Sequence, residues 1–258
     1  MSKLIRRHDI AEYINSMGSV NFEALKKRFP QVSEMTLRTD LKELDESGRI
    51  IRTRGGAKSI NSNTCASDQY LRRVQSNVGK KTQIAMKAAE YLREQLSRSP
   101  ILTVYLGPGS TVTEIAKRFP DEWCTIVTSS ISSAYELTAL KRPKVIVTGG
   151  TLNRFNCCCD GMSGPNHVER MNFDIMFLSV AGYSEAAGFT CIEEIWDGSM
   201  DAVKKHSQKV IVPIDSTKFD VTYPITHATL DEVDIVISDD GIGSEITEHF
   251  TSHGVQVL

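Results

Sequence analysis

The feature that most constrains this fold is a series of short, continuous apolar runs along residues 79–258, most of them separated by segments with helical periodicity. We expect strands at Ile101–Leu106, Cys124–Thr128, Val145–Thr148, Ile175–Ala181, Val210–Ile214, Val233–Ser238 and Val255–Leu258. We expect helices between most of them, at Thr111–Phe119, Ser132–Leu140, Asp197–Gln208 and Ser244–His253. Apolar strands joined by helical crossovers are typical of a mainly parallel sheet that is covered on both faces. The sequence therefore predicts an α/β domain over residues 79–258.

The first sixty residues have a different pattern, in which apolar side chains recur at helical spacing in three short segments. These side chains are Ile10, Ile14 and Met17; Phe22, Leu25 and Phe29; and Leu37, Leu41 and Leu44. Gly18, Pro30 and Gly48 stand where the three helices are expected to end, and Asn21 and Ser33 are good N-cap residues. We therefore expect a compact unit of three short helices.

Charge is distributed unevenly along the chain. The formal net charge is −2, from 30 Lys and Arg residues against 32 Asp and Glu residues. Residues 1–60 hold 12 basic and 8 acidic residues, a balance of +4, which leaves 18 basic and 24 acidic residues, a balance of −6, in the rest. A basic end on an acidic body is typical of a nucleic-acid-binding module attached to another domain.

The exposed face of the third helix carries side chains that suit DNA. With its leucines buried, the helix presents polar and basic residues that reach base edges or phosphates in a major groove, and its N-terminus favours a phosphate. The following segment, Arg49–Lys58, predicts a basic hairpin with a turn at Gly55–Gly56, a wing for the DNA backbone or the minor groove. The expected DNA-binding residues are Ser33, Glu34, Thr36, Arg38, Thr39, Lys42, Arg52 and Arg54.

A small protein-interaction domain with a charged face is the alternative for this unit. Charge alone favours that alternative, but the order of two helices, a polar-faced helix and a basic hairpin favours DNA. We place the DNA-binding domain at residues 1–57 and a polar linker at 58–78, because residues 59–68 are rich in Ser and Asn. Whether Tyr70–Arg73 begin a helix is left open by the sequence.

Several protein classes are set aside by composition. The chain shows no apolar stretch near the roughly 20 residues that a membrane-spanning helix needs, so we expect a cytoplasmic protein. Its six cysteines show neither a C-x-x-C pair nor a Cys/His ligand pattern, so we expect reduced thiols, no metal and no cofactor. The cysteines are Cys65, Cys124, Cys157, Cys158, Cys159 and Cys191.

Small and hydroxyl-bearing residues follow most of the expected strands. In a parallel sheet the ligand lies outside the carboxyl ends of the strands, where Gly allows close approach, backbone N–H groups bind anions and Lys218 supplies positive charge. The expected pocket therefore takes a small phosphorylated, polyhydroxylated ligand. Taken singly, Gly149–Gly150 and Asp215 are more simply turn or capping residues, and it is their convergence with other strand ends that favours a pocket. The expected effector-binding residues are Gly109, Ser110, Thr111, Thr128, Ser129, Gly149, Gly150, Asp215 and Lys218.

Two groups of motifs carry a family resemblance. Gln31–Leu41, followed by Leu44, Gly48, Ile51–Arg52 and Gly55–Ala57, resembles the winged helix-turn-helix of the DeoR family of bacterial transcriptional regulators. The ordered run of Gly109–Thr111, Val127–Ser129, Val147–Gly150, Gly161, Phe173–Asp174, Gly188–Thr190 and Asp215–Phe219 resembles the effector domain of the same family, which is similar in fold to ribose-5-phosphate isomerase. The resemblance implies operator DNA and a sugar-phosphate effector as partners. Thr39 stands where the family usually has a second Arg, and Gly107 where it usually has Asp.

Two readings of function follow. The first is a homo-oligomeric regulator, dimer or tetramer, in which a sugar phosphate controls operator binding and which represses genes of sugar metabolism. The second is a sugar-phosphate isomerase or transferase with an accessory N-terminal domain. An isomerase needs a positioned general base, and Gly107 and Met200 lack polar groups where one is expected, so the sequence favours the first reading and a protein that is not an enzyme.

Overall fold

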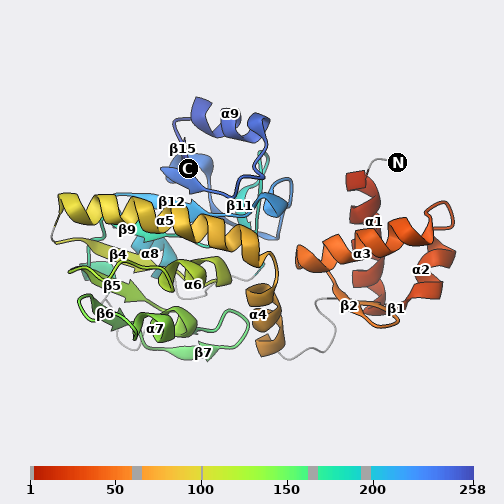
Figure 1. Cartoon of the computed structure of the whole chain (residues 1–258), viewed down its shortest axis with the longest axis horizontal. Helices are drawn as coiled ribbons and strands as arrows, with labels where there is room; N and C mark the ends of the chain where they lie inside the picture. The colour runs from red at the N-terminus through yellow and green to blue at the C-terminus, as the bar shows by residue number, and fades with distance from the viewer. Residues whose placement is uncertain (1–2, 60–65, 100, 162–167, 193–198) are drawn as a thin grey trace. The chain divides into compact units, whose positions relative to one another are not determined.

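The computed structural model describes residues 3–59, 66–99, 101–161, 168–192 and 199–258 (Figure 1). The chain divides into two compact units, Met1–Asn77 and Val78–Leu258. Cys65 and residues 196–198, on which sequence-based expectations fall, lie outside the described residues.

The N-terminal unit is a small helical domain with a three-stranded antiparallel sheet in the order β1–β3–β2. Its elements are α1 (Lys3–Met17), β1 (Ser19–Asn21), α2 (Phe22–Arg28), α3 (Glu34–Glu46), β2 (Ile51–Thr53), β3 (Gly56–Lys58) and α4 (Ala66–Gln75). Asn21 and Ser33 cap α2 and α3 by accepting the N–H groups of Ala24 and Thr36, as the sequence predicts. The predicted leucines of α3 lie in one core with Ile10 and Ile14 of α1.

Two features of this unit differ from the expectation. The turn of the hairpin is at Arg54–Gly55, one residue earlier than predicted, and Gly56 belongs to β3. The reason is that β1, which the sequence did not reveal, pairs with β3, and a Cβ atom at Gly56 would lie 2.1 Å from the carbonyl oxygen of Val20. Tyr70–Arg73 lie inside α4, which decides the question that the sequence left open.

The second unit is built on a seven-stranded sheet in which every neighbouring pair is parallel, so the α/β prediction is confirmed. The strand order is β15–β14–β12–β9–β4–β5–β6. The strands are β4 (Thr103–Leu106), β5 (Thr125–Thr128), β6 (Lys144–Val147), β9 (Ile175–Phe177), β12 (Val210–Pro213), β14 (Ile235–Ile237) and β15 (Gln256–Val257), each within a predicted run or one residue outside it.

Helices and a small second sheet cover the two faces of the parallel sheet (Figure 1). Along β4, Val104 and Leu106 pack in one apolar cluster with Ile84, whereas Tyr105 packs in the opposite cluster with Phe250. Successive side chains of a strand point to opposite faces, so the helix of Ile84 and the helix of Phe250 lie on different sides. The helices are α5 (Val78–Arg98), α6 (Ser110–Ala116), α7 (Ile131–Leu137), α8 (Ser199–Lys205) and α9 (Ser244–Ser252).

The sequence missed the short antiparallel strands, which are three or four residues of mixed polarity and carry too little periodicity to be recognised. They form a hairpin, β7–β8, and a sheet in the order β10–β11–β13. Their bounds are β7 (Thr151–Asn153), β8 (Cys158–Asp160), β10 (Gly182–Ser184), β11 (Gly188–Cys191) and β13 (Ile225–Ala228); three short 3-10 turns are η1 (Val168–Arg170), η2 (Ser216–Lys218) and η3 (Leu230–Glu232).

Candidate nucleic-acid interface and effector site

Helix α3 exposes the side chains that the sequence assigns to DNA. Leu37, Leu41 and Leu44 are buried, and the opposite face is open to solvent. Of the eight predicted residues, seven are exposed and Thr36 is half-buried. The helix thus presents its polar face to solvent.

Several of these side chains are held in place by local contacts. The Ser33 hydroxyl accepts the Thr36 N–H at 3.2 Å, so Ser33 acts as a cap whatever else it contacts. The Arg38 guanidinium lies 4.2 Å from the centre of the Phe22 ring, a cation–π contact that fixes an exposed cation on the helix face. Glu34 forms an ion pair with Lys26, whose hydrogen bond lowers the pKa of that carboxyl. Lys26 thereby offsets the repulsion that Glu34 would exert on a phosphate.

The wing is anchored to α3 through its backbone. The N–H of Arg52 donates to Oδ1 of Asp45 at 2.8 Å, and the N–H of Phe22 donates to the carbonyl of Gly55 at 2.8 Å. The side chains of Arg52 and Arg54 are exposed, one on β2 and one at the turn. Two cations are therefore carried by a hairpin whose position relative to α3 is fixed within this unit.

Asp40 is a residue of this unit that the sequence analysis missed. It is only 1% exposed, and its two oxygens accept the Nε hydrogens of Arg6 and Arg7 at 2.6 and 2.9 Å. Burial alone would raise the pKa of Asp40, but the hydrogen bonds and charges of the two arginines outweigh it and hold this pKa below its usual value. A carboxyl directly before Leu41 on the leucine face of α3, together with an Arg pair in α1, was the signal. It joins α1 to α3.

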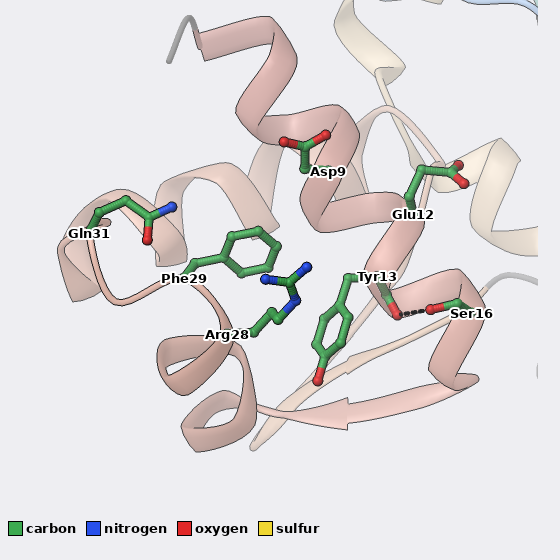
Figure 2. A pocket seen from close by; sticks show the side chains of 7 residues that line it. All are labelled: Asp9, Glu12, Tyr13, Ser16, Arg28, Phe29 and Gln31. Atoms are coloured by element: carbon green, nitrogen blue, oxygen red, sulfur yellow. Dashed lines mark hydrogen bonds between the residues drawn. The ribbon is translucent and has the colours of Figure 1, made fainter.

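A hollow of about 470 Å³ lies between α1 and α2 of the same unit (Figure 2). The Arg28 guanidinium lies 5.7 Å from the ring centres of both Tyr13 and Phe29. The remaining lining residues are Asp9, Glu12, Ser16 and Gln31. Two exposed carboxylates disfavour a phosphorylated ligand, so this hollow is not the predicted effector pocket.

In the α/β unit, the order of strands locates the crevice. The chain runs from β4 to β5 and β6 on one side, and β9 then returns to the other side of β4. Ligands of open α/β sheets bind at such a reversal, outside the carboxyl ends of the strands. The predicted residues Gly109, Ser110 and Thr111 follow β4, and Ser179 follows β9.

Gly109 and Thr111 show what this reversal point requires. Gly109 has a φ of 145°, and a Cβ atom there would lie 2.2 Å from Oγ of Ser179, so the two strand exits are in close contact. Thr111 is 1% exposed, and its buried Oγ1 has no hydrogen-bond partner among the described residues. A buried hydroxyl without a partner is uncommon and points to a group that completes it. The sequence missed Ser179 because the expected strand ran to Ala181, whereas β9 ends at Phe177 and leaves Ser179 beyond its end.

Thr128 ends β5 and Ser129 follows it, and both are buried. The Thr128 hydroxyl donates to the carbonyl of Leu106 at 2.6 Å and accepts the N–H of Ser130 at 3.0 Å, so it joins the ends of β4 and β5. The Tyr105 hydroxyl donates to Ser129 Oγ at 3.3 Å. Both predicted residues therefore lie next to the reversal point, and the Thr128 hydroxyl also links two strand ends of the sheet.

Asp215 and Lys218 both follow β12 but have different roles. The Asp215 carboxyl accepts the N–H of Thr217 at 3.1 Å and caps η2, the simpler of the two roles that the sequence allowed. Lys218 Nζ donates to the carbonyl of Val180 at 2.9 Å. Because Val180 directly follows Ser179, this contact places the ammonium charge of Lys218 beside the exit of β9.

Gly149 and Gly150 lie apart from this group. They follow β6, the edge strand, and are exposed. A Cβ atom at Gly150 would lie 2.1 Å from the carbonyl oxygen of Gly161, so close packing of the β7–β8 hairpin is sufficient reason for this glycine. From β12 to β6 is four strand spacings, about 19 Å, which is wider than a small sugar phosphate. The predicted set therefore contains a central group near β4 and β9 and a peripheral pair at β6.

The run of three cysteines forms part of the hairpin beside β5. The N–H of Cys159 donates to the carbonyl of Ser129 at 2.9 Å, and the carbonyl of Cys157 accepts the N–H of Ile131 at 3.0 Å. Burial raises the pKa of the Cys158 thiol above its usual range. Among the described residues the cysteines form no disulfide, and no cluster of three or more potential metal ligands is present.

A further cluster, also missed, lies next to η2. The Asp239 carboxyl, 1% exposed, accepts the N–H of Ser216 at 2.6 Å and the Nζ of Lys80 at 2.8 Å. Burial acts to raise the pKa of Asp239, but these hydrogen bonds and the Lys80 charge lower it. Lys80 lies in the first turn of α5, so the cluster joins the exit of β14 to the helix that opens the second unit.

Comparison with known families decides the class of protein. The model of the DeoR C terminal sensor domain matches residues 76–240, and that of the DeoR-like helix-turn-helix domain matches residues 6–63. The chain belongs to the DeoR family of transcriptional regulators. Residues 6–63 are therefore its helix-turn-helix domain, and residues 76–240 of the α/β unit are its sensor domain.

Named relatives span nearly the whole chain. The HTH-type transcriptional regulator GlpR of Haloferax volcanii is 29% identical over 98% of this chain and 96% of the relative. The HTH-type transcriptional regulator GolR of Listeria innocua is 27% identical over 98% and 96%. The L-fucose operon activator of Escherichia coli is 28% identical over 92% and 96%.

Among solved structures, ribose 5-phosphate isomerase A of Methanocaldococcus jannaschii matches 54% of this chain and 53% of its own, with 14% identity and a TM-score of 0.36. That score is too low to support an argument, so the fold rests on the strand order described above. No helix in the described part of the chain is long and apolar enough to cross a membrane.

Proposed function

We propose that this DeoR-family regulator is a cytoplasmic, homo-oligomeric repressor of carbohydrate-metabolism genes that is controlled by a phosphorylated sugar. Residues 1–57 would bind the operator, residues 58–78 would link the domains and residues 79–258 would bind the effector. One relative is the L-fucose operon activator of Escherichia coli, which supports a role in sugar metabolism. The same name describes an activator, so the sign of regulation needs a direct test.

The observation that carries the effector proposal is the convergence of polar groups at the β4–β9 reversal point. Thr111, with its unpartnered hydroxyl, Ser179 and Lys218 follow β4, β9 and β12, three strands that are neighbours in the sheet, and this supports one crevice at their ends. Hydroxyls and a fixed ammonium suit a ligand that carries both hydroxyl groups and a phosphate. We assign Gly109–Thr111, Ser129 and Lys218 to the pocket, with Thr128 and Asp215 as its support and Gly149–Gly150 at its rim.

The same crevice disfavours the enzyme reading. A Cβ atom at Gly107 would lie 2.8 Å from the carbonyl oxygen of Phe177 and 3.5 Å from Cε of Met200. A carboxylate side chain at position 107 would therefore meet backbone and a thioether. An isomerase needs a general base beside the substrate carbon, and the space next to Gly107 holds a backbone carbonyl and the Met200 side chain instead. We propose that the crevice binds without turnover.

A route from the crevice to the linker is part of the proposal. The η2 turn contains both Lys218 and Ser216, and Ser216 contacts Lys80 at 2.5 Å. A ligand on Lys218 would shift η2 and, through Lys80, the first turn of α5. Such a shift changes operator affinity only if the ligand binds the DNA-bound and free forms with different affinity.

The DNA arm is tested with Arg38→Ala and a matched control. Arg98 is an exposed arginine with an ion pair to Glu94 and lies in the other unit, so Arg98→Ala removes equal charge away from α3. In a gel shift with DNA upstream of the neighbouring genes, Arg38→Ala should weaken binding at least tenfold and Arg98→Ala less than twofold. Equal affinity of the Arg38→Ala variant and the unaltered protein would refute the assignment of α3.

The effector-binding proposal is tested with Lys218→Ala, and Lys209→Ala is the control. Lys209 is exposed and directly precedes β12, whereas Lys218 follows the other end of that strand. Thermal shifts are measured with a panel of aldose and ketose phosphates, the free sugars and inorganic phosphate. A ligand at one hundred times its Kd stabilises the sensor domain by about 2.7 kcal/mol. Lys218→Ala should lose that shift while keeping ligand-free DNA binding. A shift that is unchanged in Lys218→Ala would place the pocket elsewhere.

A further inference from the structure

The exposed face of α3 has an apolar centre that includes Met35, a residue that the predicted set of DNA-binding residues left out. Met35 is the second residue of α3 and is 80% exposed. Because a helix has 3.6 residues per turn, Met35, Thr39 and Lys42 form one line, directly opposite the buried leucines. The N-terminal part of a recognition helix is the part that reaches base edges. Met35 and Thr39 therefore occupy the centre of the face where bases would be read.

Thr39 adds a methyl group to this centre. Its hydroxyl donates to the carbonyl of Met35 at 2.9 Å, so the polar group is used within the helix. Of the neighbouring cations, Arg38 lies to one side over the Phe22 ring, and Lys42, further along the same line, lies 3.6 Å from Glu46. The N-terminal centre of the face thus consists of a thioether and a methyl group, with Arg38 and Lys42 next to it.

Only one base presents an apolar group in the major groove. Adenine, guanine and cytosine show donors and acceptors there, whereas thymine adds a 5-methyl group. A polar base edge that is buried against the Met35 thioether would lose its hydrogen bonds to water without replacement. The exposed cations Arg38, Arg52 and Arg54 match the phosphates on either side of such a base.

We propose that Met35 and Thr39 read thymine in the operator through its 5-methyl group, and that they are specificity-determining residues of this regulator. The inference rests on the placement of α3 in the major groove. Met35 supplies a flexible, polarisable surface that adapts to the methyl group, and Thr39 extends that surface by one helical turn. Thr39 stands where the family usually has a second Arg. On this proposal it replaces a cation that would read guanine or bind phosphate with a methyl group that contacts thymine.

The test uses the full-length protein and duplexes that it selects from a random pool. Each thymine of the selected site is replaced in turn by uracil, which removes only the 5-methyl group, and the Kd is measured by fluorescence anisotropy. The unaltered protein should lose about threefold to fivefold in affinity for each thymine in contact. Met35→Ala should bind the thymine and uracil duplexes with equal affinity when the replaced thymine is the one that Met35 contacts. Thr39→Ser should do so when the replaced thymine is the adjacent one, which Thr39 contacts.

The control is Met17→Ala, since Met17 is also an exposed methionine of this unit, at the end of α1. It should keep the thymine preference of the unaltered protein. If the unaltered protein selects a site but binds every uracil duplex with equal affinity, or if Met35→Ala keeps the preference, the methyl reading is wrong and the DNA-binding assignment stands. If the unaltered protein enriches no sequence, or Arg38→Ala binds the selected duplex equally well, the placement of α3 fails and the methyl reading fails with it.

Discussion

Replacing Asp40 with Asn removes the charge on which two arginines of α1 converge. Asp40 accepts hydrogen bonds from Arg6 through Nε at 2.6 Å and Nη2 at 3.2 Å, and from Arg7 at 2.9 Å. An Asn side chain keeps one acceptor oxygen and turns an NH₂ donor toward an arginine donor. Arg6 then loses its carboxylate partner beside a nearly fully buried position, and Arg7 keeps only its ion pair with Glu43.

The expected loss follows from this geometry. Removing one partner of a buried ion pair costs about 3–5 kcal/mol. The side chains of Arg6 and Arg7 are each 18% exposed, so water partly replaces the lost carboxylate, and we expect about 2–3 kcal/mol. For a unit of this size each kcal/mol lowers the midpoint of thermal unfolding by about 4–8 °C, so the variant should unfold roughly 10–20 °C lower.

Two spectroscopic signals distinguish the unfolding of the two units. Both tryptophans, Trp123 and Trp196, belong to the second unit, so tryptophan fluorescence follows that unit, whereas far-ultraviolet circular dichroism follows both. Asp40→Asn should add an early circular dichroism transition with an unchanged fluorescence transition. Glu46→Gln, which removes only the surface pair with Lys42, is the control and should shift unfolding by less than about 0.5 kcal/mol. An Asp40→Asn midpoint within 2 °C of the unaltered protein would refute the reasoning.

The ion pairs of Asp40 with Arg6 and Arg7 also make the stability of the N-terminal unit depend on pH. The pKa of Asp40 is lowered in the folded state, so its stabilising effect is fully present above the unfolded pKa, about 3.9, and is lost as the pH falls through the lower folded value. The difference in stability between Asp40→Asn and the unaltered protein should therefore be constant from pH 6 to 8 and should decrease toward zero below pH 4. A difference that vanished near pH 7 would contradict this assignment.

Three other changes test the remaining features. Gly109→Ala should abolish the thermal shift by the effector, because the new Cβ meets Ser179 at a φ of 145° that only glycine adopts easily; ligand binding equal to that of the unaltered protein would show that this contact can relax. Lys80→Ala should bind the effector and the operator but transmit less than half of the coupling free energy, because its contact with Asp239 is lost; unchanged coupling in paired titrations would exclude this route. Arg54→Ala should reduce the slope of log K against log salt by about 1, and an equal slope would remove the wing from the phosphate contacts.

The sequence predicted what depends on local pattern and on repeated signals. Asn21 and Ser33 as caps and the leucine stripe of α3 follow from single-helix chemistry, and the parallel strands follow from continuous apolar runs. What it missed depends on contacts between distant segments. Ser179 becomes part of the crevice only because β9 returns beside β4, and Asp40 looks like a surface carboxylate until α1 is packed against α3.

The candidate pocket shows the same limit. Strand ends are easy to find in a sequence, but their order across the sheet is not. Gly149–Gly150 were grouped with Gly109 because both follow a strand, whereas β6 lies at the sheet edge, two strands from β4. Only the strand order distinguishes the reversal point from the edge.

The most direct test of the account measures operator affinity with and without the sugar phosphate that gives the largest thermal shift. The central claim is that a ligand beside Lys218 controls DNA binding, so the operator Kd should change at least fivefold in the unaltered protein. By linkage, operator DNA should change the affinity for the sugar phosphate by the same factor, and Lys218→Ala should remove both effects. A sugar phosphate that binds tightly to the sensor domain and leaves the operator Kd unchanged would contradict the account.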